Sequence, residues 1–298
     1  MAGLRLRACD RELTFAGRPL LMGVVNATPD SFSDSGGRTL DERAGLAAAL
    51  LRDGATIIDV GGESNVTNRP AVGIDEEIER VVPLIERVAS LGAVVSVDTY
   101  KPAVAAAAVA AGAHMVNDIS GLADTGLADV CARTGAALVV MHTPVAPKTQ
   151  SLDEDRFADA AAEVAEFLAG RMAAAAARGV DREQILLDPG PDFGKTPAQT
   201  VAVLRGLPVL RALGRPLLLA VSRKDFIGAI TRRRPRERDP GTLAAVGHGA
   251  DLGADVFRVH DVRGTADFLA VRAVLRGDDE LAPGARVPDD LRREPPSR

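Results

Sequence analysis

The stretches TIIDVGG (residues 56–62) and VVSVDT (94–99) decide the fold, because each is a short apolar run that contains a carboxylate near its end. The pattern of an apolar run closed by polar residues recurs in LLMGVVN (20–26), MVND (115–118), LVVMH (138–142), ILLDPG (185–190), LLLAVSRK (217–224) and VFRVHD (256–261). In a parallel (β/α) barrel the loops that follow the strands share one face. The sequence therefore predicts an α/β fold, a (β/α)8 TIM barrel, whose functional residues converge at one end.

Alanine-rich segments with charges at helical intervals separate the apolar runs, for example at residues 40–54 and 74–92. Alanine is the best helix former, and a glycine closes each of these segments, where a helix should stop before the next strand. We therefore assign residues 19–276 to one barrel domain. Residues 1–18 are expected to form a short hairpin below it, and the proline-rich, charged residues 277–298 a disordered tail.

The composition excludes several classes of protein. A net charge of -5 argues against general nucleic-acid binding, which usually leaves a basic footprint. No apolar run approaches the roughly 18 residues that a membrane helix needs, and the first residues carry charges where a signal peptide would be apolar. We expect a cytoplasmic protein that binds neither nucleic acid nor membrane.

The polar strand ends offer two kinds of chemical group. Oxygen atoms and one amide come from Asp98, Asn117 and Asp188, and they suit a ring that carries several N–H donors. Positive charge comes from Lys224, Arg258 and His260, and it suits a phosphate. A polar heterocycle with an attached anionic group is therefore the expected ligand.

The order of the motifs resembles that of the dihydropteroate synthases. The string MGVVNATPDSFSDSGG (22–37) resembles the family's opening signature, and it is followed in the family's order by IIDVGGES, SVDTYK, VNDISGL, DPGPDFGKT, SRKDFIG and RVHDV. The resemblance covers about residues 19–275. It implies that 6-hydroxymethyl-7,8-dihydropterin pyrophosphate and p-aminobenzoate condense to 7,8-dihydropteroate and pyrophosphate, with Mg²⁺ assisting. It also implies a homodimer.

The same resemblance assigns roles to individual residues. Asp98, Asn117, Asp188 and Lys224 would hold the pterin ring, with Met141 packing beside it. Asn26 would hold the magnesium ion on the pyrophosphate side, and the catalytic set would be Lys224, Arg258 and His260. Further substrate contacts would come from Arg69, which reaches a phosphate, and from Phe193, Ser222, Thr67 and Pro70. Asp59 and Asp118 are expected to support the pocket from beneath.

The chain departs from the family pattern in three loops, the first of which has an added serine, Ser35, in the family's usual DGG. The family's GGESTRPG here reads GGESNVTNRPAVG (61–73), so that residues 65–68 take the place of one threonine. Neutral drift, exclusion of sulfonamides, and a changed or lost acceptor are all open explanations. In DPGPDFGKT (188–196), Asp192 replaces a glycine. An exposed Asp192 would be harmless, whereas an inward one would repel p-aminobenzoate.

Two rival functions remain open at this stage. A paralogue could keep the pterin pocket without the synthase reaction, and the altered loops motivate that hypothesis. A pterin-dependent methyltransferase shares the barrel, but it needs no pyrophosphate clamp, whereas this sequence has Asn26, Arg69, Arg258 and His260.

Overall fold

Eight parallel strands form the centre of the molecule in the computed structural model, which describes residues 3–28, 38–64, 71–149 and 152–292. The sheet order is β8-β7-β6-β5-β4-β3-β10-β9, and a parallel bridge between Leu187 and Leu217 links its two ends. The strands are β3 (Leu20–Asn26), β4 (Ile57–Gly61), β5 (Val94–Asp98), β6 (Met115–Asp118), β7 (Ala137–Met141), β8 (Ile185–Asp188), β9 (Leu218–Leu219) and β10 (Val256–Val259). The predicted (β/α)8 barrel is thereby confirmed.

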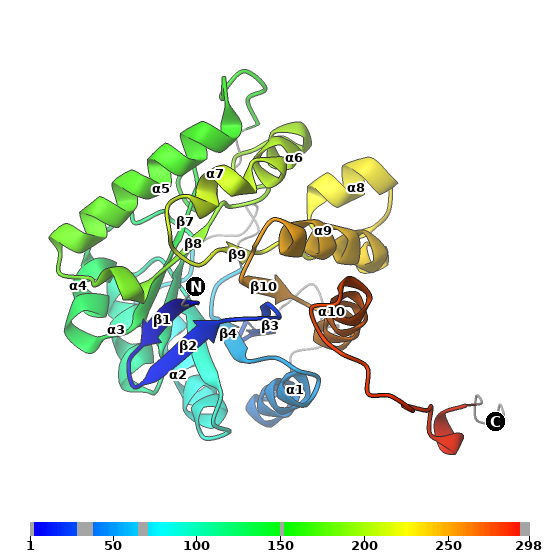
Figure 1. Cartoon of the computed structure of the whole chain (residues 1–298). Coiled ribbons are helices and arrows are strands. Elements are labelled where there is room, and N and C mark those ends of the chain that lie inside the picture. Colours follow the sequence, from blue (N-terminus) through cyan, green and yellow to red (C-terminus); the bar gives the residue numbers. More distant parts are fainter. Residues whose placement is uncertain (1–2, 29–37, 65–70, 150–151, 293–298) are drawn as a thin grey trace.

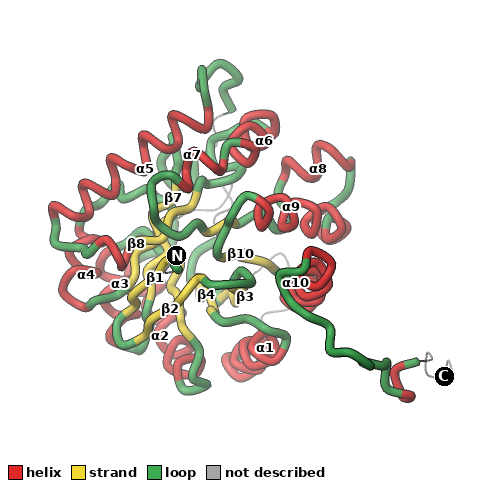
Figure 2. The backbone as a smooth tube through the Cα atoms, viewed as in Figure 1, coloured by secondary structure: helices red, strands yellow, loops and turns green. Residues whose placement is uncertain are grey.

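Helices surround the strands, as Figures 1 and 2 show. They are α1 (Leu40–Arg52), α2 (Ile74–Ala89), α3 (Pro102–Ala110), α4 (Gly126–Thr134), α5 (Ala160–Ala177), α6 (Pro197–Arg205), α7 (Leu207–Arg211), α8 (Asp225–Thr231), α9 (Asp239–Asp251) and α10 (Val262–Arg276). Residues such as Val81, Leu84 and Val88 of α2 are fully buried against the outside of the sheet. None of the helices in the described ranges is both long and apolar enough to span a bilayer.

A two-stranded antiparallel hairpin closes the bottom of the barrel, as expected. It consists of β1 (Leu4–Ala8) and β2 (Arg11–Phe15), and it lies in front of the barrel strands in Figure 1. Leu6 and Leu13 of the hairpin belong to the same apolar cluster as Met22, Ile57 and Met115 inside the barrel. This apolar plug leaves the carboxyl ends of the strands as the open end.

Short turns complete the described chain. Three 3-10 turns are η1 (Arg182–Gln184), η2 (Pro235–Glu237) and η3 (Asp289–Leu291). Beyond α10 the chain leads away from the barrel, is mostly exposed, and contains η3 as its regular element within residues 277–292. An ion pair between Arg18 and Asp279 ties the beginning of this segment to the barrel.

Candidate active site

A cavity of about 260 Å³, which we call the inner cavity, opens at the carboxyl ends of the strands. Its lining consists of Val24, Asp98, Asn117, Ile119, Met141, Asp188, Phe193, Ala220, Ser222, Lys224, Arg258 and His260. Apart from Asn26 and the three residues of loop 65–70, every site residue assigned from the sequence lies in this lining. Side chains from seven of the eight strands or the loops after them therefore meet in one hollow, as the barrel topology requires.

Three buried polar side chains form one side of the inner cavity. Asp98, Asn117 and Asp188 are 7%, 4% and 3% exposed. Asp98 and Asp188 are the last residues of β5 and β8, and Asn117 is the last but one of β6. The backbone N–H of Gly190 donates to Asp188 Oδ1 at 2.7 Å. A side chain at Gly190 would place its Cβ 2.0 Å from the carbonyl oxygen of His142, and φ there is +62°. Only glycine fits this position, which explains the DPG sequence after β8.

Arg258 lies between two buried carboxylates. Its Nε donates to Asp59 Oδ2 at 2.7 Å, and its Nη2 donates to Asp98 Oδ2 at 3.0 Å. Asn117 also donates to Asp59 Oδ2, at 3.3 Å, while Asp59 Oδ1 has no hydrogen-bond partner among the described residues. The sequence assigned Arg258 to the pyrophosphate alone. Its observed pairing shows that it holds together Asp59 and Asp98, the second of which the sequence assigned to the heterocycle.

Burial dominates the acidity of the two cavity carboxyls. It raises the pKa of Asp98, and the neighbouring Arg258 guanidinium offsets this rise only in part. Burial raises the pKa of Asp188 to about 6, although the Gly190 N–H and the cations Lys224 and Lys195 favour the ionised form. Burial thus raises the pKa of Asp98 to about 7 and that of Asp188 to about 6, so both groups accept hydrogen bonds as carboxylates in mildly basic solution and lose that ability as the pH falls.

The cationic side of the inner cavity differs from the expectation in one respect. Burial of the ring and the neighbouring Arg258 lower the pKa of His260, so that it is neutral at pH 7 rather than the cation we expected. Its Nδ1 lies 2.9 Å from Ser222 Oγ, and its backbone N–H donates to the same oxygen at 3.2 Å. His260 is thus a neutral hydrogen-bonding group, and Ser222 fixes its orientation.

Lys224 stands at the boundary of the inner cavity. Its Nζ lies 4.4 Å from the centre of the Phe193 ring, a cation–π distance. The preceding Arg223 has a left-handed backbone (φ +59°), and Asp239 holds its guanidinium with two hydrogen bonds of 2.8 and 2.9 Å. A non-glycine residue in this conformation stores backbone strain, which persists only where its surroundings fix it. Arg223 and Asp239 therefore fix the backbone immediately before Lys224, where the loop after β9 leads into α8.

A second hollow of about 480 Å³, the outer cavity, shares Ile119, Phe193 and Lys224 with the inner one. Its remaining walls come from the loops after β7, β8 and β9 and include apolar and charged side chains, namely Val145, Pro147, Lys148, Leu152, Asp192, Pro197 and Asp225. The Phe193–Lys224 pair therefore forms the wall between two neighbouring spaces. Two substrates could lie side by side across it.

Asp192 lies in the lining of the outer cavity and is not the fully exposed residue that the sequence left open. It is partly buried, with φ +63°, and its Oδ1 accepts from Thr200 Oγ1 at 3.0 Å. Its Oδ2 accepts from the backbone N–H groups of Asp225 and Phe226, at 2.5 and 3.3 Å. The carboxylate therefore ties the loop after β8 to the start of α8.

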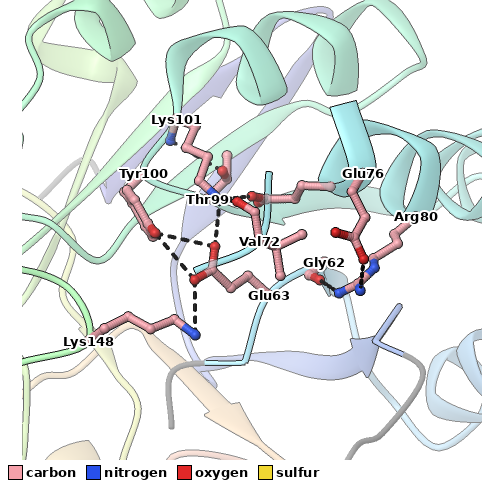
Figure 3. A network of polar contacts seen from close by, with 10 residues as sticks. Gly62, Glu63, Val72, Glu76, Arg80, Thr99, Tyr100, Lys101 and Lys148 are labelled. Atoms are coloured by element: carbon pink, nitrogen blue, oxygen red, sulfur yellow. Dashed lines mark hydrogen bonds and ion pairs between the residues drawn. The ribbon is translucent and has the colours of Figure 1, made fainter. Parts of the chain in front are cut away.

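An ion network lies beside the cavities, where the loops after β4, β5 and β7 meet (Figure 3). Lys101 Nζ donates to Glu63 Oε2 at 2.5 Å, to Glu77 and to the carbonyl oxygen of Val72 at 2.8 Å. Lys148 pairs with Glu63 Oε1 at 3.0 Å, and the Tyr100 hydroxyl donates to the same carboxylate at 3.3 Å. These bonds fix the described ends of the loop that follows β4, at residues 63 and 72.

A buried lysine that the sequence reasoning missed lies beneath the outer cavity. Lys195 is 1% exposed, and its Nζ donates to the carbonyl oxygens of Gly190 at 2.8 Å, Phe193 at 3.2 Å and His142 at 3.3 Å. Burial lowers the pKa of Lys195 to about 7. Its place in the FGKT string was the only signal, and nothing in that string indicated burial. Lys195 thus holds the loop that carries Asp192 and Phe193.

Three other polar strand ends turn away from the inner cavity. Asp59 is fully buried beneath Arg258. Asp118 accepts hydrogen bonds from the Ser120 hydroxyl and from the backbone N–H groups of Ser120 and Leu122, so that it shapes the loop after β6. His142 packs edge-on against Phe167, and burial lowers its pKa to about 3. A polar strand end therefore marks the functional face without identifying a ligand contact.

Asn26, the residue assigned to magnesium, ends β3 and is half-buried. A Cβ added to Gly61 would lie 3.8 Å from Asn26 Oδ1 and 3.6 Å from Asp98 Cβ, so the amide lies on the same side of the strand ends as Asp98. Among the described residues, no three His, Cys, Asp or Glu side chains are grouped as metal ligands. Arg69, Thr67 and Pro70 lie outside the described residues.

Comparisons with known proteins agree with this geometry. The family model described as Pterin binding enzyme matches residues 22–260. The dihydropteroate synthase of Bacillus subtilis is 42% identical over 254 residues, which cover 84% of this chain and 86% of that protein. A structure of Xanthomonas albilineans dihydropteroate synthase with 4-aminobenzoic acid superposes with a TM-score of 0.85 at 42% identity, covering 92% of this chain and 99% of that one. A structure from the same organism in complex with 7,8-dihydropteroate gives a TM-score of 0.82 at 41% identity, with coverages of 91% and 98%.

Proposed function

Since this chain belongs to the dihydropteroate synthases, a family of pterin binding enzymes, we propose that its two cavities bind the two substrates of that reaction. The reaction joins the exocyclic methylene carbon of 6-hydroxymethyl-7,8-dihydropterin pyrophosphate to the amine nitrogen of p-aminobenzoate. The C–O bond to the diphosphate breaks, and its electrons leave on pyrophosphate. The amine lone pair forms the C–N bond, and the amine loses one proton. The gathering of nine sequence-assigned residues in one hollow is the observation that carries this proposal.

The pterin ring would occupy the inner cavity. Asp98 and Asp188 are buried acceptors for its amino and ring N–H groups, and Asn117 can both donate and accept. Charge-assisted hydrogen bonds in a water-poor cavity are the stronger kind, so these residues can fix the ring's orientation. Met141, which is 2% exposed, would pack against the ring.

Breaking the C–O bond separates charge, and the inner cavity holds groups that can stabilise each sign, with Arg258 and Asp98 in contact where the two kinds of group meet. Positive charge that develops on the pterin lies beside Asp98 and Asp188, while negative charge on the leaving group would meet Arg258 and a hydrogen bond from neutral His260. Groups fixed in advance need no reorganisation when the bond breaks. Lys224, between the cavities, would carry the second positive charge near the reacting carbon.

We propose that p-aminobenzoate lies in the outer cavity, with its amine at the Phe193–Lys224 wall. That wall is the part of the outer cavity in contact with the inner one, and Phe193 offers an aromatic face to the arylamine ring. The known complex of the Xanthomonas albilineans relative with 4-aminobenzoic acid supports an arylamine as the second ligand.

A magnesium ion that is held mainly by the diphosphate of the substrate fits this chemistry. Mg²⁺ usually keeps several waters and binds through one or two protein oxygens together with phosphate oxygens. Asn26 Oδ1, beside Asp98 at the barrel mouth, suits that limited role. When bound, the ion would supply charge neutralisation to the departing diphosphate.

We also propose a homodimer that covers an apolar groove of about 330 Å³ between α6, α8 and α9. Ile230, which is 68% exposed, lines this groove with Leu204 and Phe226. A two-fold pair would bury the same apolar face on both copies. Sedimentation velocity at micromolar concentration measures the state directly, and a mass of one chain alone would rule the dimer out.

The experiment that tests the function measures pyrophosphate release from pterin pyrophosphate with Mg²⁺ and p-aminobenzoate. Release should require all three components, and the organic product should be 7,8-dihydropteroate. Removal of Mg²⁺ by EDTA should suppress release, and its return should restore it. Tight pterin binding without any release would instead identify a pterin-binding paralogue.

Replacing Asp98 by asparagine should weaken pterin binding at least tenfold. The change removes a charge-assisted hydrogen bond worth about 1.5–3 kcal/mol in a buried position. Calorimetric titration of the pterin measures the dissociation constant. Asp124→Asn, an exposed carboxylate on the same face but outside the cavity lining, is the control and should leave the constant unchanged. Equal constants for Asp98→Asn and the parent protein would remove Asp98 from the pterin site.

Pterin affinity should fall as the pH is lowered from 8 to 5. Asp188 binds the ring as a carboxylate, and its pKa is raised to about 6, so at pH 5 most of the free protein carries a proton there. Competition between that proton and the ligand predicts a dissociation constant about tenfold higher at pH 5 than at pH 8. Asp188→Asn should bind more weakly and lose the part of the pH dependence that Asp188 supplies, while Asp98, whose pKa is raised to about 7, supplies the remainder. An affinity that rises on acidification would contradict the assignment.

A further inference from the structure

We propose that Asp192 is a specificity-determining residue for the acceptor amine. Its fixed negative charge in the wall of the outer cavity weakens the binding of arylamines that carry a carboxylate, relative to neutral arylamines of the same shape. This inference rests on the proposed function, since it takes the outer cavity as the acceptor's place.

The Asp192 carboxylate cannot turn away from the outer cavity without losing its bonds. One oxygen accepts from Thr200 and the other from two successive backbone N–H groups at the start of α8. The backbone N–H of Asp192 donates to Thr200 Oγ1 at 3.1 Å, so the residue is held at both ends. The charge is therefore part of the cavity wall rather than a mobile surface group.

The cations in the same wall already have partners within the protein. Asp239 holds Arg223 with two hydrogen bonds, three carbonyl oxygens hold Lys195, and Lys148 pairs with Glu63. Lys224 faces Phe193; burial lowers the pKa of Lys224, and the carboxylates of Asp192 and Asp188 oppose that effect by favouring its charged form. An incoming carboxylate must compete for these cations with groups that the fold has placed beside them.

The two backbone N–H groups that donate to Asp192 are likewise unavailable to an incoming carboxylate. The amides of Asp225 and Phe226 directly follow Lys224, and together with it they would favour an anion. The protein's own carboxylate satisfies them instead. The Asp225 side chain does not take the place of the Asp192 carboxylate, because it is 82% exposed and pairs with Arg238 at 2.8 Å.

Asp192→Asn tests this inference. Asparagine tolerates a left-handed backbone, and its side-chain oxygen can still accept from the amides, so the loop should keep its shape. Two like charges about 6 Å apart in a partly screened cavity change affinity by up to about tenfold. We therefore expect the KM for p-aminobenzoate to fall about three- to tenfold, while the KM for neutral 4-aminobenzamide changes by less than about twofold.

Asp155→Asn removes the same charge from an exposed position outside the cavity lining and should change neither KM. A variant in which both KM values move together, or neither moves, would overturn the inference. The parent protein supplies a second measurement, because added salt screens repulsion and should lower the ratio of the KM for p-aminobenzoate to that for the amide. A ratio that rises with salt also overturns it, whereas no turnover of either amine would refute the proposed function itself.

Discussion

Arg258→Met should lower kcat/KM by about 10²–10³-fold, because it removes the preorganised positive charge that we propose faces the leaving diphosphate. The same change should destabilise the fold by about 3–5 kcal/mol. Arg258 is the counter-charge of Asp59 and Asp98, which are 0% and 7% exposed, and its loss leaves two buried carboxylates without a cation. Steady-state kinetics and denaturant unfolding measure the two effects separately.

A double variant separates the structural role of Arg258 from its role in the reaction. Asp59→Asn combined with Arg258→Met removes one of the orphaned charges, and it should recover part of the stability without recovering activity. Arg258→Lys keeps the charge but cannot reproduce the two-pronged guanidinium that reaches both carboxylates. Its activity should therefore lie between that of the parent protein and that of Arg258→Met. Full activity in a stable Arg258→Met protein would exclude the proposed role.

Lys101→Met should lower the free energy of unfolding by about 3–5 kcal/mol. Lys101 is the shared partner of Glu63 and Glu77, whose side chains are 5% and 1% exposed, and methionine leaves Glu77 with a buried charge and without this ion pair. The arrangement in Figure 3 shows that the same ammonium also holds Val72, at the end of the loop after β4. Chemical denaturation, followed by circular dichroism, gives the value.

A matched surface pair calibrates that result. Arg87 pairs with Asp41 at 3.0 Å, but the two side chains are 56% and 82% exposed, so Arg87→Met should cost less than about 1 kcal/mol. Adding Glu77→Gln to Lys101→Met should restore part of the loss, because the buried charge is removed with its partner. A Lys101→Met protein as stable as its Arg87→Met counterpart would show that the network contributes nothing to the fold.

The sequence was sufficient to predict where the site lies and which strand ends form it. Asp98, Asn117 and Asp188 each follow an apolar run of a few residues, and the topology of a parallel barrel brings such positions together whatever their separation along the chain. The signal is local, since it needs only the pattern within each run. The ordered motifs then supplied the chemistry.

The partners of the charged groups could not be predicted in this way. Arg258 contacts carboxylates 160 and 199 residues away, and the sequence does not show that it turns inward toward Asp59. Asp192 engages amides 33 and 34 residues further along, which depends on how the loops after β8 and β9 approach each other. The neutral state of His260 likewise follows from burial and from the neighbouring cations Arg258 and Arg223, the second of which comes from the loop after β9. Such pairings depend on three-dimensional packing, which periodicity does not encode.

The most direct test is a crystal structure of the protein with 6-hydroxymethyl-7,8-dihydropterin pyrophosphate bound. We expect the ring in the inner cavity, with its N–H groups on Asp98, Asn117 and Asp188 and its diphosphate on the side of Arg258, His260 and Asn26. Density for the ring anywhere else, or a reversed ring with its diphosphate against Asp188 and its N–H groups away from Asp98 and Asn117, would contradict this assignment.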